Sequence, residues 1–400
     1  MSTLSSLGIS SSSSSSSSSL LPSPSSSSGP QHKKSHFPSS PHPYHCWTQK
    51  HSFHSTLPSA STNDKEQKLE KNDTIRSTAT TSDPPILTWY DPYVAEWMGP
   101  YLRLARVDKP IGTWLLLWPC LWSTAMAASA PATTTITASS STSLLLPDPY
   151  LMGLFTVGSF VMRGSGCTIN DMWDQDFDKR VARTKSRPLA SGELNSTQAI
   201  GFLGLQLATG LGVLLSLPNM EYCFMWGVSS LPLVVMYPLM KRFTNFPQVF
   251  LGLTFNWGAW MGWAATYGSM NYAVIAPLYL SGVCWTVVYD TIYANQDKHD
   301  DKAIGLKSTA LTFGEDETKH KQILHGFAAL TFVQWLAAGY MMEDISMVPY
   351  SAGMSLAYSH LLWQIQTAEL DNPQNLADRF RSNTGLGGIV FAAIVAGKVL

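Results

Sequence analysis

The stretch that decides the fold is 170–178, Asn-Asp-Met-Trp-Asp-Gln-Asp-Phe-Asp, which directly follows an apolar segment. In a helix, Asn170, Asp174 and Asp178 would fall at i, i+4 and i+8, so their side-chain oxygens would project from one face. Asp171 leads a second row with Asp174 and Asp178, at i, i+3 and i+7. Five basic residues lie in the nine positions that follow. An acidic stripe bordered by cations therefore lies where the chain leaves an apolar segment.

A second acidic stretch has the same design. It is 290–301, Asp-Thr-Ile-Tyr-Ala-Asn-Gln-Asp-Lys-His-Asp-Asp, and it also ends an apolar segment. On a helix, its side chains at Asp290, Tyr293, Asp297 and Asp301 would share one face. Carboxylates at a membrane boundary are costly unless they are solvated, paired or bound to metal. The presence of two such stripes therefore favours a shared cation site. Two unrelated helix ends whose carboxylates are simply solvated are the less favoured reading.

The composition is that of a membrane protein. Charged residues make up 13% of the 400, about half the usual globular share, while hydrophobic residues reach 45%. A net charge of -1 excludes a strongly basic nucleic-acid binder, and we expect no nucleic-acid partner. The five cysteines show no CxxC or other short paired spacing, so neither a disulfide framework nor a zinc site is indicated.

Residues 1–85 are of low complexity and are expected to be a disordered targeting region. Serine is continuous from Ser10 to Ser19, and no acidic residue occurs before Asp64. Such a segment cannot bury a core, and a serine-rich, acid-poor start is typical of organelle transit peptides. Arginine is absent before Arg76, so the basic amphipathic helix of a mitochondrial presequence is not visible. Import is still favoured over an inert tail, and the lack of an apolar leader argues against secretion.

Residues 86–400 are expected to form one all-α membrane domain. Nine stretches are apolar and long enough to cross the ~30 Å hydrocarbon layer as helices. The expected spans are at about 111–130, 149–168, 197–217, 222–240, 247–267, 272–292, 323–342, 348–367 and 384–399.

Loop charges predict the orientation of these spans. The loops after the first, third, fifth and seventh spans carry no Lys or Arg, whereas the basic residues gather in the other loops and before the first span. By the positive-inside rule, both acidic stretches then lie on the same inner face. In a mitochondrial inner membrane that face is the matrix side.

The chemistry of the two stripes indicates a phosphorylated substrate. Oxygen ligands favour a hard cation, and Mg²⁺ is typically held by few carboxylates while substrate phosphates complete its shell. Adjacent Lys and Arg suit a diphosphate leaving group. A calcium loop starting at Asp174 fails, because Lys179 and Lys185 occupy the positions of the required Gly and Glu.

The paired stretches resemble the two Asp-rich motifs of the UbiA superfamily of intramembrane prenyltransferases. Over about 90–400, four further motifs are similar to its 4-hydroxybenzoate polyprenyltransferase branch. These motifs are Arg106-Val-Asp-Lys-Pro-Ile-Gly-Thr-Trp, Thr184-Lys-Ser-Arg-Pro-Leu-Ala-Ser-Gly, Tyr237-Pro-Leu-Met-Lys-Arg and Gly305-Leu-Lys-Ser-Thr. The resemblance implies about nine transmembrane helices around a central cavity, with two Asp-rich loops capping it.

The resemblance also implies roles for individual residues. The metal ligands carried over, for Mg²⁺ and its diphosphate, are Asn170, Asp174, Asp178, Asp297 and Asp301. The four aspartates of that set and Arg242 are the expected catalytic residues. Expected substrate-binding residues are Arg106, Arg163, Asp171, Lys179, Lys241, Tyr293 and Lys307. Gln175 stands where some bacterial members carry a basic residue, which leaves the diphosphate contacts there in doubt.

Arg163 has two readings of equal weight. It lies about two turns before Asn170, and a lone arginine inside a membrane usually faces a cavity or a partner. It would bind the carboxylate of an aromatic acceptor or a phosphate oxygen, or else it would neutralise Asp174.

The expected reaction is Mg²⁺-dependent transfer of a polyprenyl group from its diphosphate to carbon 3 of 4-hydroxybenzoate, in ubiquinone synthesis. Expected partners are these two substrates and the bilayer, with association with other ubiquinone-synthesis enzymes left open. Transfer to homogentisate, naphthoate, chlorophyllide or haem is the nearest alternative. A membrane carrier that binds metal and lipid without turnover is the alternative from another class.

Overall fold

The computed structural model describes residues 88–128, 146–181 and 184–400. The expected targeting region, 1–85, lies outside the described residues. Within them every regular element is helical, and no strand is present. Two 3₁₀ turns and one short helix come first, η1 (Asp91–Tyr93), η2 (Glu96–Met98) and α2 (Gly99–Leu104).

The expected spans correspond to long helices of the described chain, and the all-α membrane-bundle prediction is confirmed. The long helices are α3 (Ile111–Ala127), α4 (Pro149–Trp173), α7 (Ser196–Leu215), α8 (Met220–Phe243), α9 (Pro247–Phe255), α10 (Gly258–Tyr267), α11 (Tyr272–Ala294), α14 (Glu317–Tyr340), α15 (Met347–Thr367) and α16 (Pro373–Val399). The segments Ser196–Leu215, Met220–Phe243, Tyr272–Ile304, Glu317–Tyr340 and Pro373–Val399 meet both length and apolarity requirements for a membrane span. Helix α3 is a shorter apolar helix.

The fifth expected span is two helices and not one. Helix α9 ends at Phe255 and α10 begins at Gly258. Between them, the Asn256 side-chain amide donates to the Gly252 carbonyl at 2.9 Å and to the Thr286 hydroxyl at 2.9 Å. The Asn256 carbonyl accepts from Ala259, three residues on, in place of the usual four. A polar side chain that competes for backbone partners explains the break.

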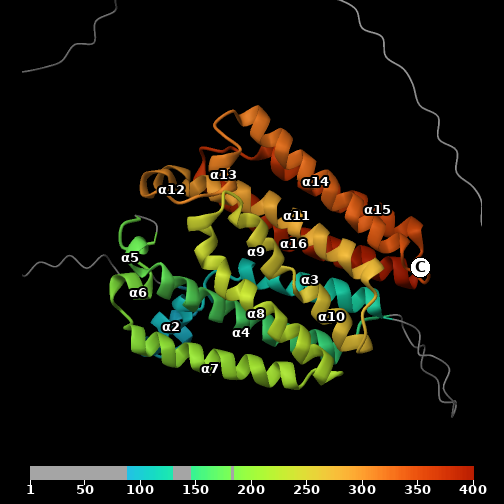
Figure 1. The fold of residues 1–400 in the computed structure, drawn as a ribbon, viewed down its shortest axis with the longest axis horizontal. Helices are drawn as coiled ribbons and strands as arrows, with labels where there is room; N and C mark the ends of the chain where they lie inside the picture. The colour runs from blue at the N-terminus through green and yellow to red at the C-terminus, as the bar shows by residue number, and fades with distance from the viewer. Residues whose placement is uncertain (1–87, 129–145, 182–183) are drawn as a thin grey trace, which may run out of the picture. The chain divides into compact units, whose positions relative to one another are not determined.

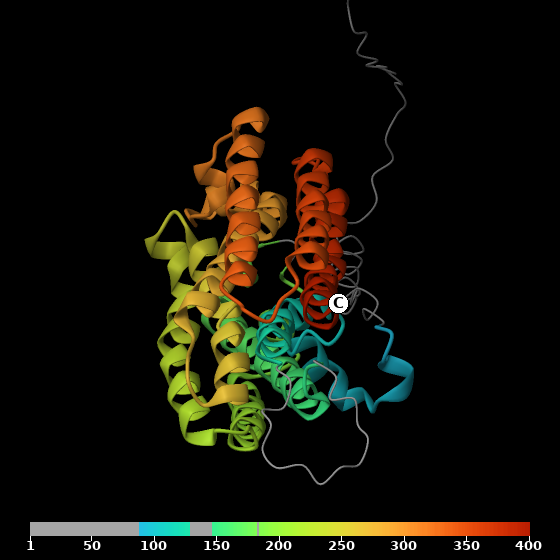
Figure 2. The ribbon, with the colours of Figure 1, turned by 90° about the vertical axis from the view of Figure 1, so that its right-hand side faces the viewer.

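The last long helix, α16, packs against α3, α11 and α15. Trp122 on α3 donates its indole N–H to the Gly387 carbonyl at 2.9 Å, and Trp285 on α11 donates to the Asn383 side chain at 2.8 Å. Trp118 lies so close to Gly387 that a Cβ there would overlap its indole. Figures 1 and 2 show α16 beside α15, away from α7. The aromatic core is therefore assembled from helices far apart in the sequence.

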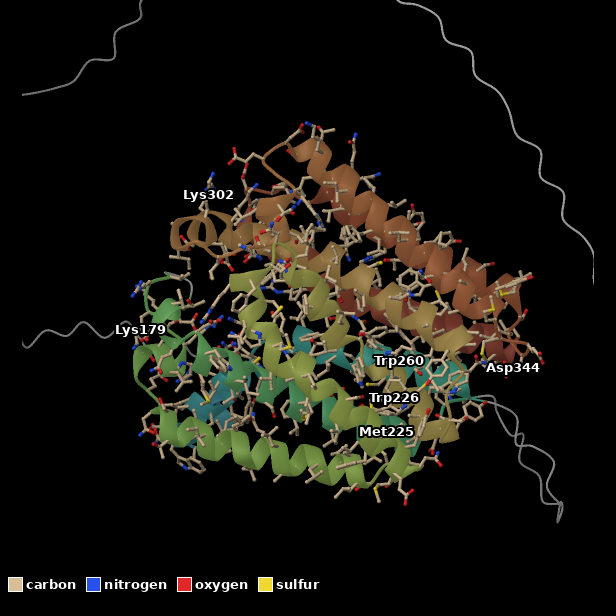
Figure 3. All side chains as sticks on the ribbon, viewed as in Figure 1. Lys179, Met225, Trp226, Trp260, Lys302 and Asp344 are labelled. Atoms are coloured by element: carbon tan, nitrogen blue, oxygen red, sulfur yellow. The ribbon has the colours of Figure 1, made fainter. Side chains whose placement is uncertain are left out.

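Helix α8 is tied to α10 by tryptophans. Trp226 stacks on Trp260 with centroids 5.1 Å apart (Figure 3), and Trp257 donates to the Trp226 carbonyl at 2.9 Å. These contacts give Trp257 and Trp260 a role in packing between α8 and α10.

The short helices gather at one end of the bundle. They are α5 (Gln175–Asp178), α6 (Pro188–Ser191), η3 (Asn295–Asp297), α12 (Lys298–Ile304) and α13 (Thr309–Thr312). Lys179 and Lys302 mark this end in Figure 3, and Asp344 marks the other. The Lys307 amide donates to the Lys241 carbonyl at 2.9 Å, which joins the second acidic stretch to the end of α8. Both acidic stretches thus lie at the same end.

Candidate active site

A cavity of about 920 Å³ lies among α3, α4, α7, α8, α9, α10 and α11. Its wall along α7 and α8 is apolar, with Leu211, Leu214, Val228 and Leu231 among the lining residues. Its charged and polar lining comes largely from α4, α8 and α11 and from the loops that follow them. That lining includes Arg106, Lys109, Arg163, Asn170, Asp171, Arg187, Lys241, Asp290, Tyr293, Asp297 and Asp301. Members of both acidic stripes therefore face one shared space.

Asp171 is the centre of a buried ion-pair network. Its side chain is 1% exposed and accepts from Arg106 Nη2 at 2.8 and 2.7 Å. Arg187 Nη1 donates to Asp171 at 3.0 Å and to Asp178 Oδ2 at 2.8 Å. Arg106 has a φ of 58°, a left-handed backbone that non-glycine residues seldom adopt. The network fixes the chain before α3 and the loop after α5 against the end of α4.

The carboxyls of Asp174 and Asp178 are held by arginines. Asp174 caps the end of α4 and accepts from Arg242 Nη2 at 3.2 Å. Burial raises the pKa of Asp174 above its usual value, although Lys241 and Arg242 oppose the shift. Burial likewise raises the pKa of Asp178, against the effect of Arg187. A cation that binds these carboxyls would compete with protons as well as with the arginines.

The second stripe does not lie on one continuous helix. Helix α11 ends at Ala294, and the 3₁₀ turn η3 leads into α12. Asn295 stabilises that turn by donating its side-chain amide to the Thr291 carbonyl at 2.9 Å. Asp290, Tyr293, Asp297 and Asp301 nevertheless all line the cavity, as the spacing predicted. The tightened turn replaces part of the regular helix because Asn295 takes a backbone acceptor.

The predicted basic residues divide into two groups. Lys241 lines the cavity, and the Arg242 guanidinium lies over the Phe177 ring at 5.0 Å. Lys179 is exposed and donates to Asp176 at 3.0 Å, while Lys307 is exposed and donates to the Phe243 carbonyl at 3.3 Å. Neither Lys179 nor Lys307 belongs to the cavity lining. Their roles in substrate binding stay predictions.

Arg163 projects from α4 into the cavity, well below the acidic rim. Its Nε is buried and has no hydrogen-bond partner within the described chain. The guanidinium lies 5.6 Å from the Phe255 ring centroid and fills the space that a Cβ at Gly112 would need. Among the described residues no carboxylate lies within 4.0 Å of it, so the reading that it directly pairs with Asp174 lacks structural support. A buried cation facing a cavity can bind an anionic group of a ligand.

The donor set fits a hard cation that is shared with a ligand. In the described part of the chain, no three His, Cys, Asp or Glu side chains come close enough to hold a metal by themselves. Mg²⁺ usually takes one or two carboxylates and completes its shell with water and substrate phosphates. The oxygens of Asn170, Asp297 and Asp301 at the cavity rim suit that arrangement.

Sequence analysis missed Gln248, a cavity-lining residue on α9. Its side-chain oxygen accepts from the Thr309 amide at 3.0 Å, and its side chain lies within electrostatic reach of Asp290. The available signal was a glutamine just inside an apolar span, next to Pro247.

Comparison with known proteins identifies the family. A profile of the UbiA prenyltransferase family matches residues 116–391. The chain belongs to the UbiA prenyltransferase family. The mitochondrial 4-hydroxybenzoate polyprenyltransferase of Arabidopsis thaliana is 50% identical over 311 residues, which are 78% of this chain and 72% of that protein. The Homo sapiens enzyme of the same name is 49% identical over 300 residues, 75% of this chain and 76% of that protein.

Solved UbiA structures share the fold. A UbiA homologue from Aeropyrum pernix superposes with a TM-score of 0.57 at 18% identity, covering 70% of this chain and 96% of that one. A UbiA homologue from Archaeoglobus fulgidus, bound to DMAPP and Mg²⁺, superposes with a TM-score of 0.57 at 17% identity. It covers 75% of this chain and 99% of that chain. At these identities the likeness establishes the UbiA fold alone.

Proposed function

We propose that this protein transfers a polyprenyl group from its diphosphate to carbon 3 of 4-hydroxybenzoate, a step of ubiquinone synthesis. The observation that carries the proposal is the shared cavity, which members of both acidic stripes and several cations line beside an apolar wall. The names of relatives at about 50% identity support the choice of 4-hydroxybenzoate as acceptor.

The residues at the rim bind and orient the diphosphate. Asn170, Asp174, Asp178, Asp297 and Asp301 would hold Mg²⁺, which would supply Lewis-acid stabilisation to the leaving group when bound. Lys241 lies at the same end of the cavity and adds a positive charge where negative charge develops. The structures of an Archaeoglobus fulgidus UbiA homologue bound to DMAPP and Mg²⁺ or to GPP and Mg²⁺ support this assignment.

The deeper residues hold the hydrocarbon and the acceptor. Apolar side chains of α7 and α8 pack against the polyprenyl chain and exclude water from the allylic cation. Arg163 binds the carboxylate of 4-hydroxybenzoate, because it is a buried cation without a carboxylate partner in the described chain. This contact places the ring below the diphosphate, with carbon 3 free to attack.

The proposed location is the mitochondrial inner membrane, with the acidic loops in the matrix. The relatives are named mitochondrial, and several helices are apolar enough to cross a bilayer. The one-sided loop charges support the orientation. Association with other enzymes of ubiquinone synthesis stays an expectation from the resemblance.

The test is a membrane assay with 4-hydroxybenzoate, a polyprenyl diphosphate and Mg²⁺. Product should form, and it should vanish with EDTA and in the Asp174→Ala and Asp297→Asn variants. Asp300→Asn is the matched control, because Asp300 is exposed and is not part of the cavity lining. If only homogentisate or naphthoate is prenylated, the assignment of 4-hydroxybenzoate as the acceptor is wrong. If no product forms with any acceptor, the membrane-carrier alternative is favoured.

A further inference from the structure

Prenylation of an aromatic ring leaves a proton to be removed, and the structure offers a specific acceptor for it. This inference rests on the proposed aromatic transfer. The electron pair of the ring forms the bond from carbon 3 to the prenyl carbon, while the bond from that carbon to the diphosphate oxygen breaks. The proton on carbon 3 must then leave, so that its bonding electrons restore the aromatic ring. A base has to lie at the depth of the ring, below the diphosphate.

Asp290 lies at that depth. It is on α11, seven residues before Asp297, which corresponds to roughly 10 Å of helix rise. Arg163 is seven residues before Asn170 on α4, so it lies about the same distance below the first stripe. Both residues line the cavity. An acceptor that binds Arg163 through its carboxylate would therefore lie level with Asp290.

Asp290 differs from the aspartates of the first acidic stretch in its charged neighbours. Arg163 on α4 and Lys241 on α8 interact with it electrostatically, as does Asp297. No ion pair within 4.0 Å engages Asp290 in the described chain, whereas Asp171, Asp174 and Asp178 each accept from an arginine. Tyr237 and Tyr289 also lie within reach of its charge. Asp290 is thus a carboxylate inside the cavity that no guanidinium neutralises by contact.

Gln248, Thr309 and Thr291 form a hydrogen-bonded group next to Asp290. The Gln248 side-chain oxygen accepts from the Thr309 backbone amide at 3.0 Å. A backbone N–H can only donate, so the atom of the Gln248 amide group that faces Thr309 is the oxygen. The Gln248 amide nitrogen is left to face Asp290, whose charge Gln248 influences. Thr309 in turn exchanges a hydrogen bond with Thr291, one residue beyond Asp290 on α11. The Gly305–Thr309 motif therefore supports the carboxylate from behind.

We propose that Asp290 is the catalytic base that accepts the ring proton from carbon 3, and that Gln248 is its positioning residue. The proton passes to a carboxylate oxygen of Asp290, and the C–H electron pair returns to the ring. Diphosphate leaves with the electron pair of its broken bond, and no other reactant is needed.

The test is the kinetic isotope effect on kcat with 4-hydroxybenzoate deuterated at carbons 3 and 5. The wild type should show an effect near one, because proton loss to a positioned base is fast. In Asp290→Asn, kcat should fall by about 10²-fold or more, and a primary isotope effect should appear, because proton loss becomes rate-limiting. The Mg²⁺ concentration for half-maximal rate should not change. Asp300→Asn is the matched control and should keep the wild-type rate without an isotope effect, because Asp300 is exposed and is not part of the cavity lining.

Two outcomes overturn the proposal. Unchanged kcat without an isotope effect in Asp290→Asn would mean that diphosphate or water takes the proton. A loss of rate with an altered Mg²⁺ requirement and no isotope effect would make Asp290 part of the metal site. Gln248→Ala decides the question if Asp290→Asn does not fold, since it keeps the carboxylate. A primary isotope effect in Gln248→Ala supports the base, and its absence overturns it.

The measurement on the wild type distinguishes a failure of the proposed function from a failure of this inference. If the wild type prenylates another aromatic acid, the acceptor assignment fails. The same isotope measurement on that acid still decides the role of Asp290, because any ring that is prenylated on carbon must lose its proton.

Discussion

Asp171 and Asp176 belong to the same acidic stretch, yet their surroundings differ completely. The Asp171 side chain is 1% exposed between Arg106 and Arg187, while that of Asp176 is 85% exposed and contacts Lys179. A buried charge that loses its partner is costly, whereas a surface pair contributes little. The two residues should therefore respond very differently to the same substitution.

Asp171→Asn should lower the free energy of unfolding by about 3 kcal/mol, because two largely buried guanidinium groups lose their shared carboxylate. Thermal unfolding of the purified protein in detergent measures the effect. Asp176→Asn is the control and should leave the melting temperature nearly unchanged. Equal melting temperatures for the two variants would contradict the assignment of Asp171 to a stabilising network.

Arg163→Gln should raise the KM for 4-hydroxybenzoate while changing the KM for the polyprenyl diphosphate little. Loss of a charge-assisted hydrogen bond is worth about 1.5–3 kcal/mol, which corresponds to roughly a ten- to hundredfold rise. Steady-state kinetics with each substrate varied in turn measures this. Arg163→Lys should recover part of the loss. A rise confined to the diphosphate KM would instead assign Arg163 to the phosphate.

At the residue scale, helical spacing predicted a shared face within each acidic stretch, and Asn170, Asp297 and Asp301 do line one cavity. Asp174 and Asp178 do not belong to the described lining of that cavity, and their role as metal ligands stays a prediction. The Asp171–Arg187 pair depends on how the loop after α5 folds back. Gln248 depends on a backbone amide 61 residues away. Contacts of that kind follow from packing, which local spacing does not encode.

At the scale of single helices, apolar length located the spans well and missed the interruption between α9 and α10. The stretch 247–267 is mostly apolar, with only a few polar positions, so hydropathy alone predicts a single helix. The interruption follows from Asn256, whose amide reaches Thr286 on α11. Asn256, a polar residue in an apolar span, was the available signal for the interruption, but its partner Thr286 lies in another helix.

Helix α16 offers a matched pair of glycines for a test of packing. Gly387→Ala should destabilise the protein by about 1–3 kcal/mol, because the new Cβ would overlap Trp118. Gly385→Ala should be neutral or stabilise by up to about 1 kcal/mol, since nothing lies within 4 Å of its Cβ position. Melting temperatures in detergent compare the two. A stable Gly387→Ala variant would mean that α3 and α16 pack less closely than described.

At the scale of the whole molecule, catalysis and targeting should be separable. Described residues from Arg103 to Phe380 line the cavity, whereas the expected targeting signal lies in 1–85. Deletion of 2–80 should spare activity in isolated membranes and should keep the protein out of mitochondria in cells. Activity assays and organelle fractionation measure the two effects. A shortened chain that still reaches mitochondria would show that the address lies elsewhere.

The contact of α3 with α16 has a consequence for how the protein is made. Trp122 finds its carbonyl acceptor 265 residues later in the chain. During import with the N-terminus leading, α3 reaches the inner membrane before α16, and its indoles must meanwhile face lipid or an insertion factor. A chain whose import stops before α16 would leave a membrane-inserted but incomplete bundle with exposed tryptophans. Quality-control proteases of the membrane would recognise such chains by the face of α3 that α16 normally covers.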